Sequence, residues 1–315
     1  MLKKKVLKVL EENKGSALSG EEIAVMLGVS RSAVWKAVKS LKAEGHEIEA
    51  ITNKGYTLSE QSDILSEEGI SLLLENKASV TVLNETTSTN DIAKIKVIEK
   101  VNHGSVVVAN SQTAGRGRRG RSFFSPKDSG VYFSIILRPK VSPEKCVLLT
   151  SATAVAVCEA IEELTSQKAE IKWLNDVYVN SKKCAGIILE GVFDLNGGED
   201  NYIIVGIGVN VTTVDFPDEF SKRAGSVGAL SRNALVAKVV NKLVKICENL
   251  ESREYLEEYK RRCFVLKKTI TVLKNDDTYT AFAEDIDDIA RLIVVKENGE
   301  REVLYNEEVS TRYEQ

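Results

Sequence analysis

Residues 104–137 read GSVVVANSQTAGRGRRGRSFFSPKDSGVYFSIIL, in which two apolar runs enclose a segment rich in glycine and arginine. The runs 104–109 and 130–137 are short, rich in β-branched and aromatic residues and bounded by turn-forming residues, which is typical of buried strands. Further apolar runs of strand length occupy residues 169–173, 185–189 and 202–211. Longer helical patterns occupy residues 90–101, 144–164 and 232–261. Because several of these strands lie only a turn apart, we expect an α+β fold with a central mixed sheet that helices cover on one side.

The segment between the two strands carries four arginines among the seven residues from Gly115 to Arg121. Glycine permits sharp turns and brings backbone N–H groups close to a ligand. Arginine presents a planar, permanently charged fork that suits phosphate and carboxylate oxygens. The loop could surround an anionic ligand; a nucleic-acid contact of the RGG kind and an exposed charged loop are the alternatives that composition leaves open. No helix with a Gly-Lys-Ser/Thr start follows, so the segment is neither a Walker loop nor a dinucleotide fingerprint.

The first sixty residues predict a winged helix-turn-helix. Helical signals cover residues 2–14, 19–28 and 31–43, and two short strands, 46–52 and 55–58, flank the turn Asn53-Lys54-Gly55. In such domains the recognition helix enters the major groove of DNA. The residues that we expect to contact DNA are Ser30, Arg31, Ser32, Lys36 and Lys39 on or beside that helix and Lys54 at the wing tip. We expect Val34 and Trp35 in the core of the domain. An exposed helix used for protein contacts is the alternative.

A connecting helix is expected between residues 62 and 80, and short apolar strands return at 269–273, 291–296 and 302–305. These C-terminal strands suggest a small β-barrel of the SH3 type. We therefore expect three domains. They are a winged helix-turn-helix in residues 1–62, a ligand-binding α+β domain in residues 63–264 and the small β domain in residues 265–315.

The composition is that of a folded protein that is not built to coat nucleic acid. Hydrophobic residues make up 43% of the chain, and 43 basic against 46 acidic residues give a formal net charge of −3. The longest apolar runs are too short to cross a bilayer, and the first residues contain no apolar core of a secretory signal. We expect a cytosolic protein with no membrane partner. The five cysteines show no CxxC spacing, so we expect reduced, buried thiols and no metal site.

Several polar groups near the predicted strands are ambiguous when each is taken alone. Hydroxyls at a helix start are ordinarily plain N-caps, and a lysine at a strand end is ordinarily a solvated charge. Taken together, five segments resemble the biotin protein ligases, specifically the bifunctional kind that is also the biotin operon repressor. They are Ser88-Thr89-Asn90, Gln112 to Arg121, Lys172-Trp173-Leu174-Asn175-Asp176, Lys183 to Ile187 and Gly206-Ile207-Gly208-Val209-Asn210. They occur in the order of the family, and the N-terminal helices match its repressor-type members.

The resemblance implies a class II synthetase-like catalytic domain that performs two reactions. Such enzymes join the carboxylate of biotin to the α-phosphate of ATP in the presence of Mg²⁺ and hold biotinyl-5′-AMP. They then transfer biotin to a lysine of a biotin carboxyl carrier protein, such as a subunit of acetyl-CoA carboxylase. The same adenylate acts as corepressor, because it favours a homodimer that binds operator DNA. Since the first reaction brings two anions together, fixed cations are required.

The resemblance also assigns roles to single residues. It implies Lys183, Arg116, Arg118 and Arg121 as the catalytic cations. The biotin site would comprise Ser88, Thr89, Asn90, Gln112, Gly115, Arg116, Gly117, Arg118, Lys183 and Gly186. The ATP and adenylate site would comprise Arg118, Arg119, Arg121, Phe123, Lys172, Asn175, Asp176 and Asn210.

The chain departs from the family pattern at a few positions. Leu174 stands where the Lys-Trp segment usually has proline, and Ala290 and Asn306-Glu307 stand where the C-terminal domain usually has glycines. Two other functions remain alternatives. One is a ligand-sensing winged-helix repressor that has lost catalysis, and the other is a related lipoate-attaching ligase.

Overall fold

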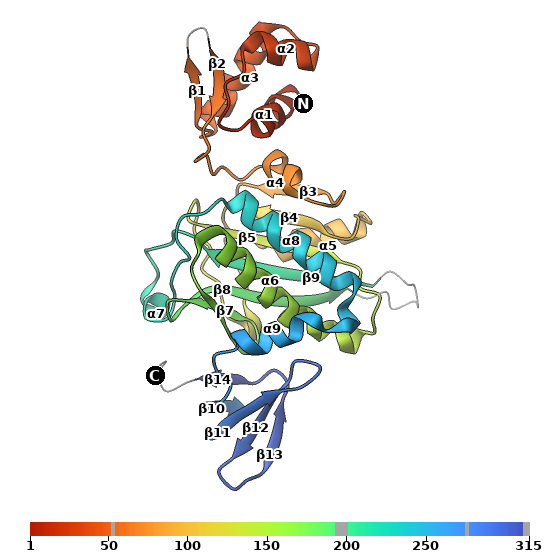
Figure 1. The fold of residues 1–315 in the computed structure, drawn as a ribbon, viewed down its shortest axis with the longest axis vertical. Coiled ribbons are helices and arrows are strands. Elements are labelled where there is room, and N and C mark those ends of the chain that lie inside the picture. The colour runs from red at the N-terminus through yellow and green to blue at the C-terminus, as the bar shows by residue number, and fades with distance from the viewer. Residues whose placement is uncertain (52–53, 193–200, 275–276, 311–315) are drawn as a thin grey trace. The chain divides into compact units, whose positions relative to one another are not determined.

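The computed structural model describes residues 1–51, 54–192, 201–274 and 277–310 (Figure 1). Within it the chain forms two compact units, residues 1–75 with 231–237 and residues 76–230 with 238–315. Asn53 of the expected wing turn lies outside the described residues.

The first unit confirms the winged helix-turn-helix. Its elements are α1 (Leu2–Glu12), α2 (Gly20–Leu27), α3 (Arg31–Ala43), β1 (Ile48–Ile51), β2 (Gly55–Leu58) and α4 (Glu67–Leu73). Ser19 and Glu22 form a reciprocal capping box at the start of α2. Gly28 ends that helix in a left-handed conformation, with φ 63°, that glycine adopts without steric cost. The side chain of Ser30 then caps α3, and β1 and β2 pair antiparallel as the wing.

The core of this unit contains Val34 but not Trp35, so the prediction for Trp35 is wrong. Val34 is fully buried, whereas Trp35 is 52% exposed. Along α3 the buried residues Val34, Ala37, Val38 and Leu41 follow helical spacing and form one face. Trp35 is rotated by about 100° from Val34 and therefore leaves that face.

The connecting helix is shorter than the sequence predicts. Helix α4 covers only seven residues, because Leu74 adopts an extended conformation with ψ 134°. The preceding segment is held within the same unit by Arg232, whose Nε donates to Asp63 Oδ2 at 2.7 Å, and by Asn233, whose Oδ1 accepts from the Ser66 N–H at 3.1 Å.

The second unit is built on a seven-stranded sheet in the order β3-β4-β5-β9-β8-β7-β6. From β3 to β9 the strands are Val80–Leu83, Ser105–Ala109, Gly130–Leu137, Ala169–Lys172, Asp176–Val179, Lys182–Val192 and Tyr202–Asn210. Strands β3 and β4 are parallel and all other neighbours are antiparallel, so the sheet is mixed as expected. Strands β5 and β9 are buried at every residue, which explains their continuous apolar sequences.

Helices α5 (Thr89–Ile98), α6 (Leu148–Thr165) and α9 (Glu254–Arg262) cover this sheet (Figure 1). Helix α5 packs on β4, β5 and β9, whereas α6 packs on β6 to β9. Two expected helices differ in their bounds. The helix predicted for residues 144–164 is preceded by the 3₁₀ segment Pro143–Val147, and the helix predicted for residues 232–261 is divided into α8 (Arg232–Glu248) and α9. The division covers residues 249–253, where Asn249 has non-helical angles (φ −128°, ψ 40°) and Arg253 has a left-handed φ of 59°.

The C-terminal strands form a separate antiparallel sheet in the order β13-β12-β11-β10-β14, consistent with an SH3-like domain. From β10 to β14 they are Thr269–Lys274, Asp277–Ile286, Leu292–Lys296, Arg301–Leu304 and Glu308–Ser310. Ala290 has a φ of 65°, so it occupies the kind of left-handed position for which glycine is the usual residue. Its carbonyl accepts a hydrogen bond of 3.0 Å from the buried Trp173 Nε1 and so connects this sheet to the β6–β7 turn.

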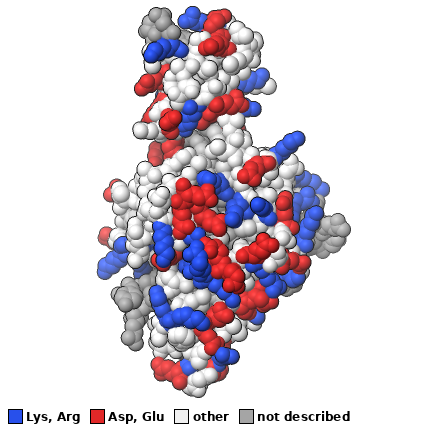
Figure 2. Space-filling model, in the orientation of Figure 1, with Lys and Arg blue, Asp and Glu red and all other residues white. Residues whose placement is uncertain are grey.

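All five cysteines are reduced and buried. In the described ranges no helix is long and apolar enough to cross a membrane, and no group of three or more His, Cys, Asp or Glu side chains could hold a metal ion. On the face drawn in Figure 2, basic and acidic side chains are interspersed.

Candidate functional site

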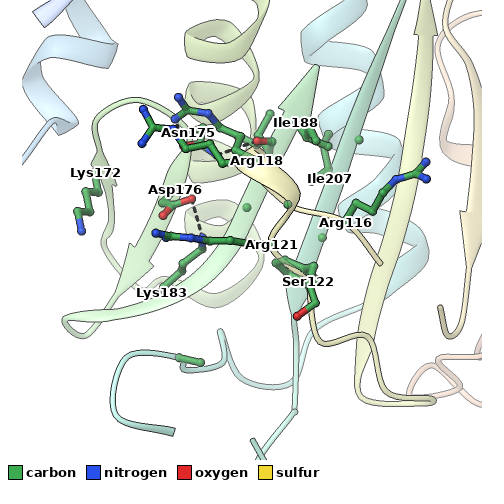
Figure 3. A pocket seen from close by; sticks show the side chains of 18 of the residues that line it. Arg116, Arg118, Arg121, Ser122, Lys172, Asn175, Asp176, Lys183, Ile188 and Ile207 are labelled. Atoms are coloured by element: carbon green, nitrogen blue, oxygen red, sulfur yellow. Dashed lines mark hydrogen bonds and ion pairs between the residues drawn. The ribbon is translucent and has the colours of Figure 1, made fainter. Parts of the chain in front are cut away.

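A cavity of about 570 Å³ lies on the central sheet (Figure 3). It is surrounded by the start of α5, the glycine–arginine loop, the strands β7 to β9 and the segments 219–224 and 306–309. The residues expected from the sequence that line it are Ser88, Thr89, Asn90, Gln112, Arg116, Gly117, Arg118, Arg119, Arg121, Phe123, Lys172, Asn175, Asp176, Lys183 and Gly186. Gly115 and Asn210 lie outside the lining. The fold therefore gathers into one cavity residues that are widely separated in the sequence.

The glycine–arginine loop is closed by its own backbone. The Gly117 N–H donates to the Arg121 carbonyl at 2.7 Å, and the Phe123 N–H donates to the Gly115 carbonyl at 2.9 Å. A Cβ at position 115 would lie 2.6 Å from both the Phe123 carbonyl oxygen and Ser125 Oγ. Gly115 therefore shapes the base of the loop, because only glycine fits where two backbone segments approach so closely.

Arg118 is a half-buried cation whose side-chain hydrogen bonds, among the described residues, go to uncharged acceptors. Its Nη1 donates to Asn175 Oδ1 at 2.9 Å and its Nη2 to the Asn306 carbonyl at 2.7 Å, and both acceptors are uncharged. No ion pair joins Arg118 to a carboxylate in the part of the chain that the structure describes. Burial lowers the pKa of the guanidinium from its usual value. Asp176 and Glu308 attract the guanidinium without forming an ion pair with it, so an anionic ligand in direct contact would be favoured at this position.

The other arginines of the loop are held by neighbouring segments. Arg121 binds Glu308 through two hydrogen bonds, and Arg119 Nη2 donates to the Asn306 carbonyl at 3.0 Å. Arg116 is paired with Asp91 in the first turn of α5. That hydrogen bond raises the pKa of Arg116 from its usual value.

Lys183 lies at the start of β8, and its Nζ is 2.7 Å from Asp176 Oδ1 on the neighbouring strand β7 (Figure 3). Its backbone is fixed by the segment after α7 (Asp218–Ser221), because the Lys183 N–H donates to the Arg223 carbonyl at 2.8 Å. Asn175 is clamped in a similar way, since its Nδ2 donates to the Ile187 carbonyl at 2.8 Å. Lys183 at the start of β8 and Arg118 in the glycine–arginine loop thus face one cavity, an arrangement that stabilises negative charge.

One end of the cavity is lined by uncharged hydrogen-bonding groups. Gln112 Oε1 accepts from the Thr89 N–H at 2.8 Å, and Gln112 Nε2 donates to Ser125 Oγ at 3.1 Å. The hydroxyl of Thr89 lies 2.7 Å from the hydroxyl of Ser134, a fully buried residue in the middle of β5. This end can therefore recognise a polar but uncharged ligand group.

The floor of the cavity consists of glycines of β8 and β9. A Cβ at Gly208 would lie 2.5 Å from Phe123 Cε1, and one at Gly186 would lie 3.2 Å from Phe123 Cε2. The ring of Phe123 therefore rests directly on the two strands and meets Tyr132 edge-on, with 6.3 Å between ring centroids. Asn210, beyond the floor, instead donates through Nδ2 to the Gly225 carbonyl at 3.1 Å.

The sequence interpretation missed two walls of the cavity. They are the segment containing Glu219, Phe220, Arg223 and Ala224, and the segment containing Asn306, Glu307, Glu308 and Val309. Neither segment carries a motif, and each reaches the cavity only through tertiary folding. Ser134 was also missed, although a lone polar residue within an apolar strand is a signal that could have found it.

In the first unit, the residues expected to contact DNA all lie on its surface. Ser30, Arg31, Ser32, Lys36, Lys39 and Lys54 are exposed. Trp35 joins them on the exposed side of α3, and Lys39 Nζ lies 5.3 Å from the centroid of its ring. The recognition-helix surface is thus cationic with one large aromatic side chain.

Comparison with known proteins assigns both units to described families. Residues 82–210 match the biotin/lipoate A/B protein ligase family and residues 3–57 match an HTH domain. The bifunctional ligase/repressor BirA of Bacillus subtilis is 35% identical over 81% of this chain and 79% of its own length. BirA of Escherichia coli is 28% identical over 89% and 88%. A biotin protein ligase from Aquifex aeolicus, solved in complex with biotin and ATP, superposes with a TM-score of 0.63 at 27% identity over 75% of this chain and 98% of that one. The chain belongs to the family of bifunctional ligase/repressor proteins named BirA.

Proposed function

We propose that this protein is an ATP-dependent biotin protein ligase and a DNA-binding repressor of biotin genes. The observation that carries the ligase proposal is the guanidinium of Arg118, which donates to uncharged acceptors and lies in the same cavity as Lys183. The uncharged polar end at Thr89 and Gln112 is suited to the ureido ring of biotin. The cationic end is suited to its carboxylate and to the phosphates of ATP.

In the first proposed reaction, a carboxylate oxygen of biotin attacks the α-phosphorus of ATP, the bond to the β-phosphate oxygen breaks, and pyrophosphate leaves. Arg116, Arg118, Arg121 and Lys183 neutralise the charge that builds up between the two anions. ATP enters as its magnesium complex, in which phosphates and water supply most of the oxygen ligands.

The remaining site residues have supporting roles in this proposal. Ser88, Asn90, Gly115, Gly117 and Gly186 shape and line the biotin site. Arg119, Phe123, Lys172, Asn175, Asp176 and Asn210 belong to the ATP and adenylate side, where Asn210 and Gly115 act from outside the lining.

In the second reaction the amine of a lysine on a biotin carboxyl carrier protein attacks the acyl carbon of biotinyl-5′-AMP. AMP leaves with the electrons of the broken bond, and the amine loses a proton. Closure of the loop over the adenylate excludes water, which would otherwise hydrolyse the mixed anhydride.

Exchange of labelled pyrophosphate into ATP tests the first reaction directly. The purified chain with Mg²⁺ should catalyse exchange when biotin is added, and mass spectrometry should detect bound biotinyl-5′-AMP. Lipoate offered in place of biotin should give no exchange. Exchange with lipoate alone would identify a lipoate ligase, and no exchange with either acid would identify a sensor without catalysis.

We further propose that Ser30, Arg31, Ser32, Lys36, Lys39 and Lys54 contact operator DNA in a homodimer formed when the adenylate is bound. Duplexes selected from a random library by the full chain with biotin and ATP would supply the operator. The Lys36→Ala variant should bind that duplex more weakly and reduce the slope of log K against log salt by about one. The Lys8→Ala variant of α1 should bind as the wild type does.

The proposed activities fit the division into residues 1–62 for DNA, 63–264 for catalysis and 265–315 as a small β domain. Both the carrier protein and ATP are found in the cytoplasm, where we propose that the protein works.

A further inference from the structure

Three residues, Thr89, Ser134 and Asn90, connect the polar end of the cavity to the carboxylate of Glu190 outside it. Asn90 Nδ2 donates to Glu190 Oε1 at 2.6 Å, and Asn90 Oδ1 lies 2.6 Å from Ser134 Oγ. Ser134 Oγ in turn lies 2.7 Å from Thr89 Oγ1. Thr89, Asn90 and Ser134 are all at least 95% buried, so water cannot reach their polar groups to take the place of a lost hydrogen bond.

The chemistry of these groups fixes the direction of every bond. The pKa of Glu190 lies below its usual value, because hydrogen bonds from Asn90 and Lys94 outweigh the opposing effect of burial. An ionised carboxylate only accepts, so the amide of Asn90 must turn its NH₂ group towards Glu190 and its oxygen towards Ser134. The single proton of Ser134 must then lie between Ser134 and Asn90 Oδ1, since an amide oxygen cannot donate.

The remaining proton in the chain belongs to Thr89. Because the Ser134 hydroxyl donates its hydrogen bond to Asn90 Oδ1, Ser134 Oγ can only accept from Thr89. The Thr89 hydroxyl therefore donates to Ser134 Oγ. Its other neighbour, Gln112 Oε1 at 3.2 Å, is also only an acceptor. Whether the Thr89 hydroxyl donates to Ser134 Oγ or to Gln112 Oε1, its proton lies in a hydrogen bond within the protein. The hydroxyl can then only accept a hydrogen bond from a ligand.

We infer that Glu190 is a positioning residue that orients the Thr89 hydroxyl as an acceptor, so that the polar end of the cavity selects a ligand with an N–H donor. This rests on the proposed function, in which the ureido ring of biotin supplies that N–H. Neither Glu190 nor Ser134 lines the cavity, so both act through Asn90 and Thr89. A ring without an N–H, such as the dithiolane of lipoate, leaves the buried acceptor unpaired and is rejected.

The position of the Asn90 amide also explains why residue 206 is a glycine. A Cβ at Gly206 on β9 would lie 2.4 Å from Asn90 Oδ1 and 3.0 Å from Asn90 Nδ2. The amide of Asn90 therefore lies flat against the sheet at a place where only glycine leaves room for it. The orientation of Asn90 is thus fixed by Glu190 and its position by Gly206.

The Glu190→Gln variant tests the inference, because a neutral amide can donate to Asn90 and so allows the whole chain of bonds to reverse. Steady-state pyrophosphate exchange should show a KM for biotin raised by about tenfold, while the KM for ATP and kcat stay within about twofold. The matched control is Lys94→Gln. In the wild type Lys94 Nζ lies 2.5 Å from Glu190 Oε2. Lys94→Gln removes this ion pair but leaves the bond between Asn90 and Glu190 in place, so the KM of this variant for biotin should equal that of the wild type.

Ser134→Ala provides an independent measurement, because it interrupts the chain without touching Glu190. It should raise the KM for biotin alone, and adding Glu190→Gln to Ser134→Ala should then have almost no further effect. An unchanged KM for biotin in Glu190→Gln, an equal rise in the KM for ATP, or full additivity of the two variants would each overturn the positioning role. Biotin-dependent exchange by the wild type, measured in the same experiment, separates these outcomes from failure of the proposed function. If the wild type gives no exchange, both proposals are overturned.

Discussion

Arg121 and Glu308 face each other in a two-pronged ion pair, with 2.9 Å between Nη1 and Oε1 and 2.6 Å between Nη2 and Oε2. Arg121 closes the glycine–arginine loop, and Glu308 begins β14 of the C-terminal sheet. Together with the bonds from Arg118 and Arg119 to the Asn306 carbonyl, the pair fastens the loop to residues 306–308.

The Glu308→Gln variant should release the loop without unfolding the protein. Arg121 is 65% exposed, so loss of the pair should lower the free energy of unfolding by less than about 1 kcal/mol. Trypsin should nevertheless cut after Arg118, Arg119 or Arg121 faster than in the wild type, as followed by mass spectrometry. Glu284→Gln, which breaks an equally exposed pair with Arg301, is the control and should leave the rate of cleavage in the loop unchanged. Equal cleavage rates in all three proteins would contradict the fastening role.

The Lys183→Ala variant should lose adenylate formation. Loss of one cation aimed at the reacting phosphate should reduce kcat of pyrophosphate exchange by at least about 10²-fold. The neighbouring Lys182, whose Nζ donates to the Lys222 carbonyl at 2.7 Å, provides the matched control. Lys182→Ala should retain exchange within about twofold. Normal exchange by Lys183→Ala would remove Lys183 from the catalytic assignment.

The Gly208→Ala variant should displace Phe123. The new methyl group would lie 2.5 Å from Phe123 Cε1, so the ring has to move, at a cost of about 1–3 kcal/mol in the free energy of unfolding. Chemical denaturation of a double-mutant cycle with Phe123→Ala checks this, because Gly208→Ala should cost almost nothing once the ring is absent. Additive costs in the cycle would show that the methyl group collides with something other than Phe123.

Arg262 should contribute to stability in a pH-dependent way. Its side chain is 6% exposed and binds Glu162 at 2.7 Å and Glu258 at 2.6 Å. Hydrogen bonds from arginines hold the pKa of each glutamate below its usual value. A carboxylate whose pKa is lowered by folding adds stability above its unfolded pKa, and this stability is lost as the pH falls through the folded value. Arg262→Met should therefore cost about 1–3 kcal/mol at pH 7, and the difference from the wild type should shrink below about pH 4.5. Urea denaturation at pH 7 and pH 4 checks this, and a constant difference would contradict it.

Local patterns were sufficient to predict five strands of the central sheet, but not β3 or β7, together with the winged helix-turn-helix and many of the residues that line the cavity. The apolar runs of β5 and β9 are unambiguous because both strands are buried at every position. The loop was identifiable because its arginines and glycines are consecutive in the sequence. Such features are encoded by neighbouring residues and need no knowledge of tertiary contacts.

The errors have tertiary causes. Whether Trp35 is buried depends on where one helix meets the core, and a shift of one residue changes its exposure. The break between α8 and α9 follows from the non-helical conformation of Asn249 and the left-handed conformation of Arg253, neither of which is glycine or proline. The wall formed by residues 306–309 follows from a contact across almost two hundred residues of sequence, as between Arg118 and Asn306, which are 188 positions apart.

That distance along the chain has a consequence for how the protein matures. During synthesis the loop, Lys183 and the glycine floor all leave the ribosome long before residues 306–309 do. Until residues 306–309 have emerged and docked, Arg118 lacks one of its two anchors and the cavity is open on one side. A partly synthesised chain can thus carry every residue of the recognisable motifs while one wall of the cavity is still missing.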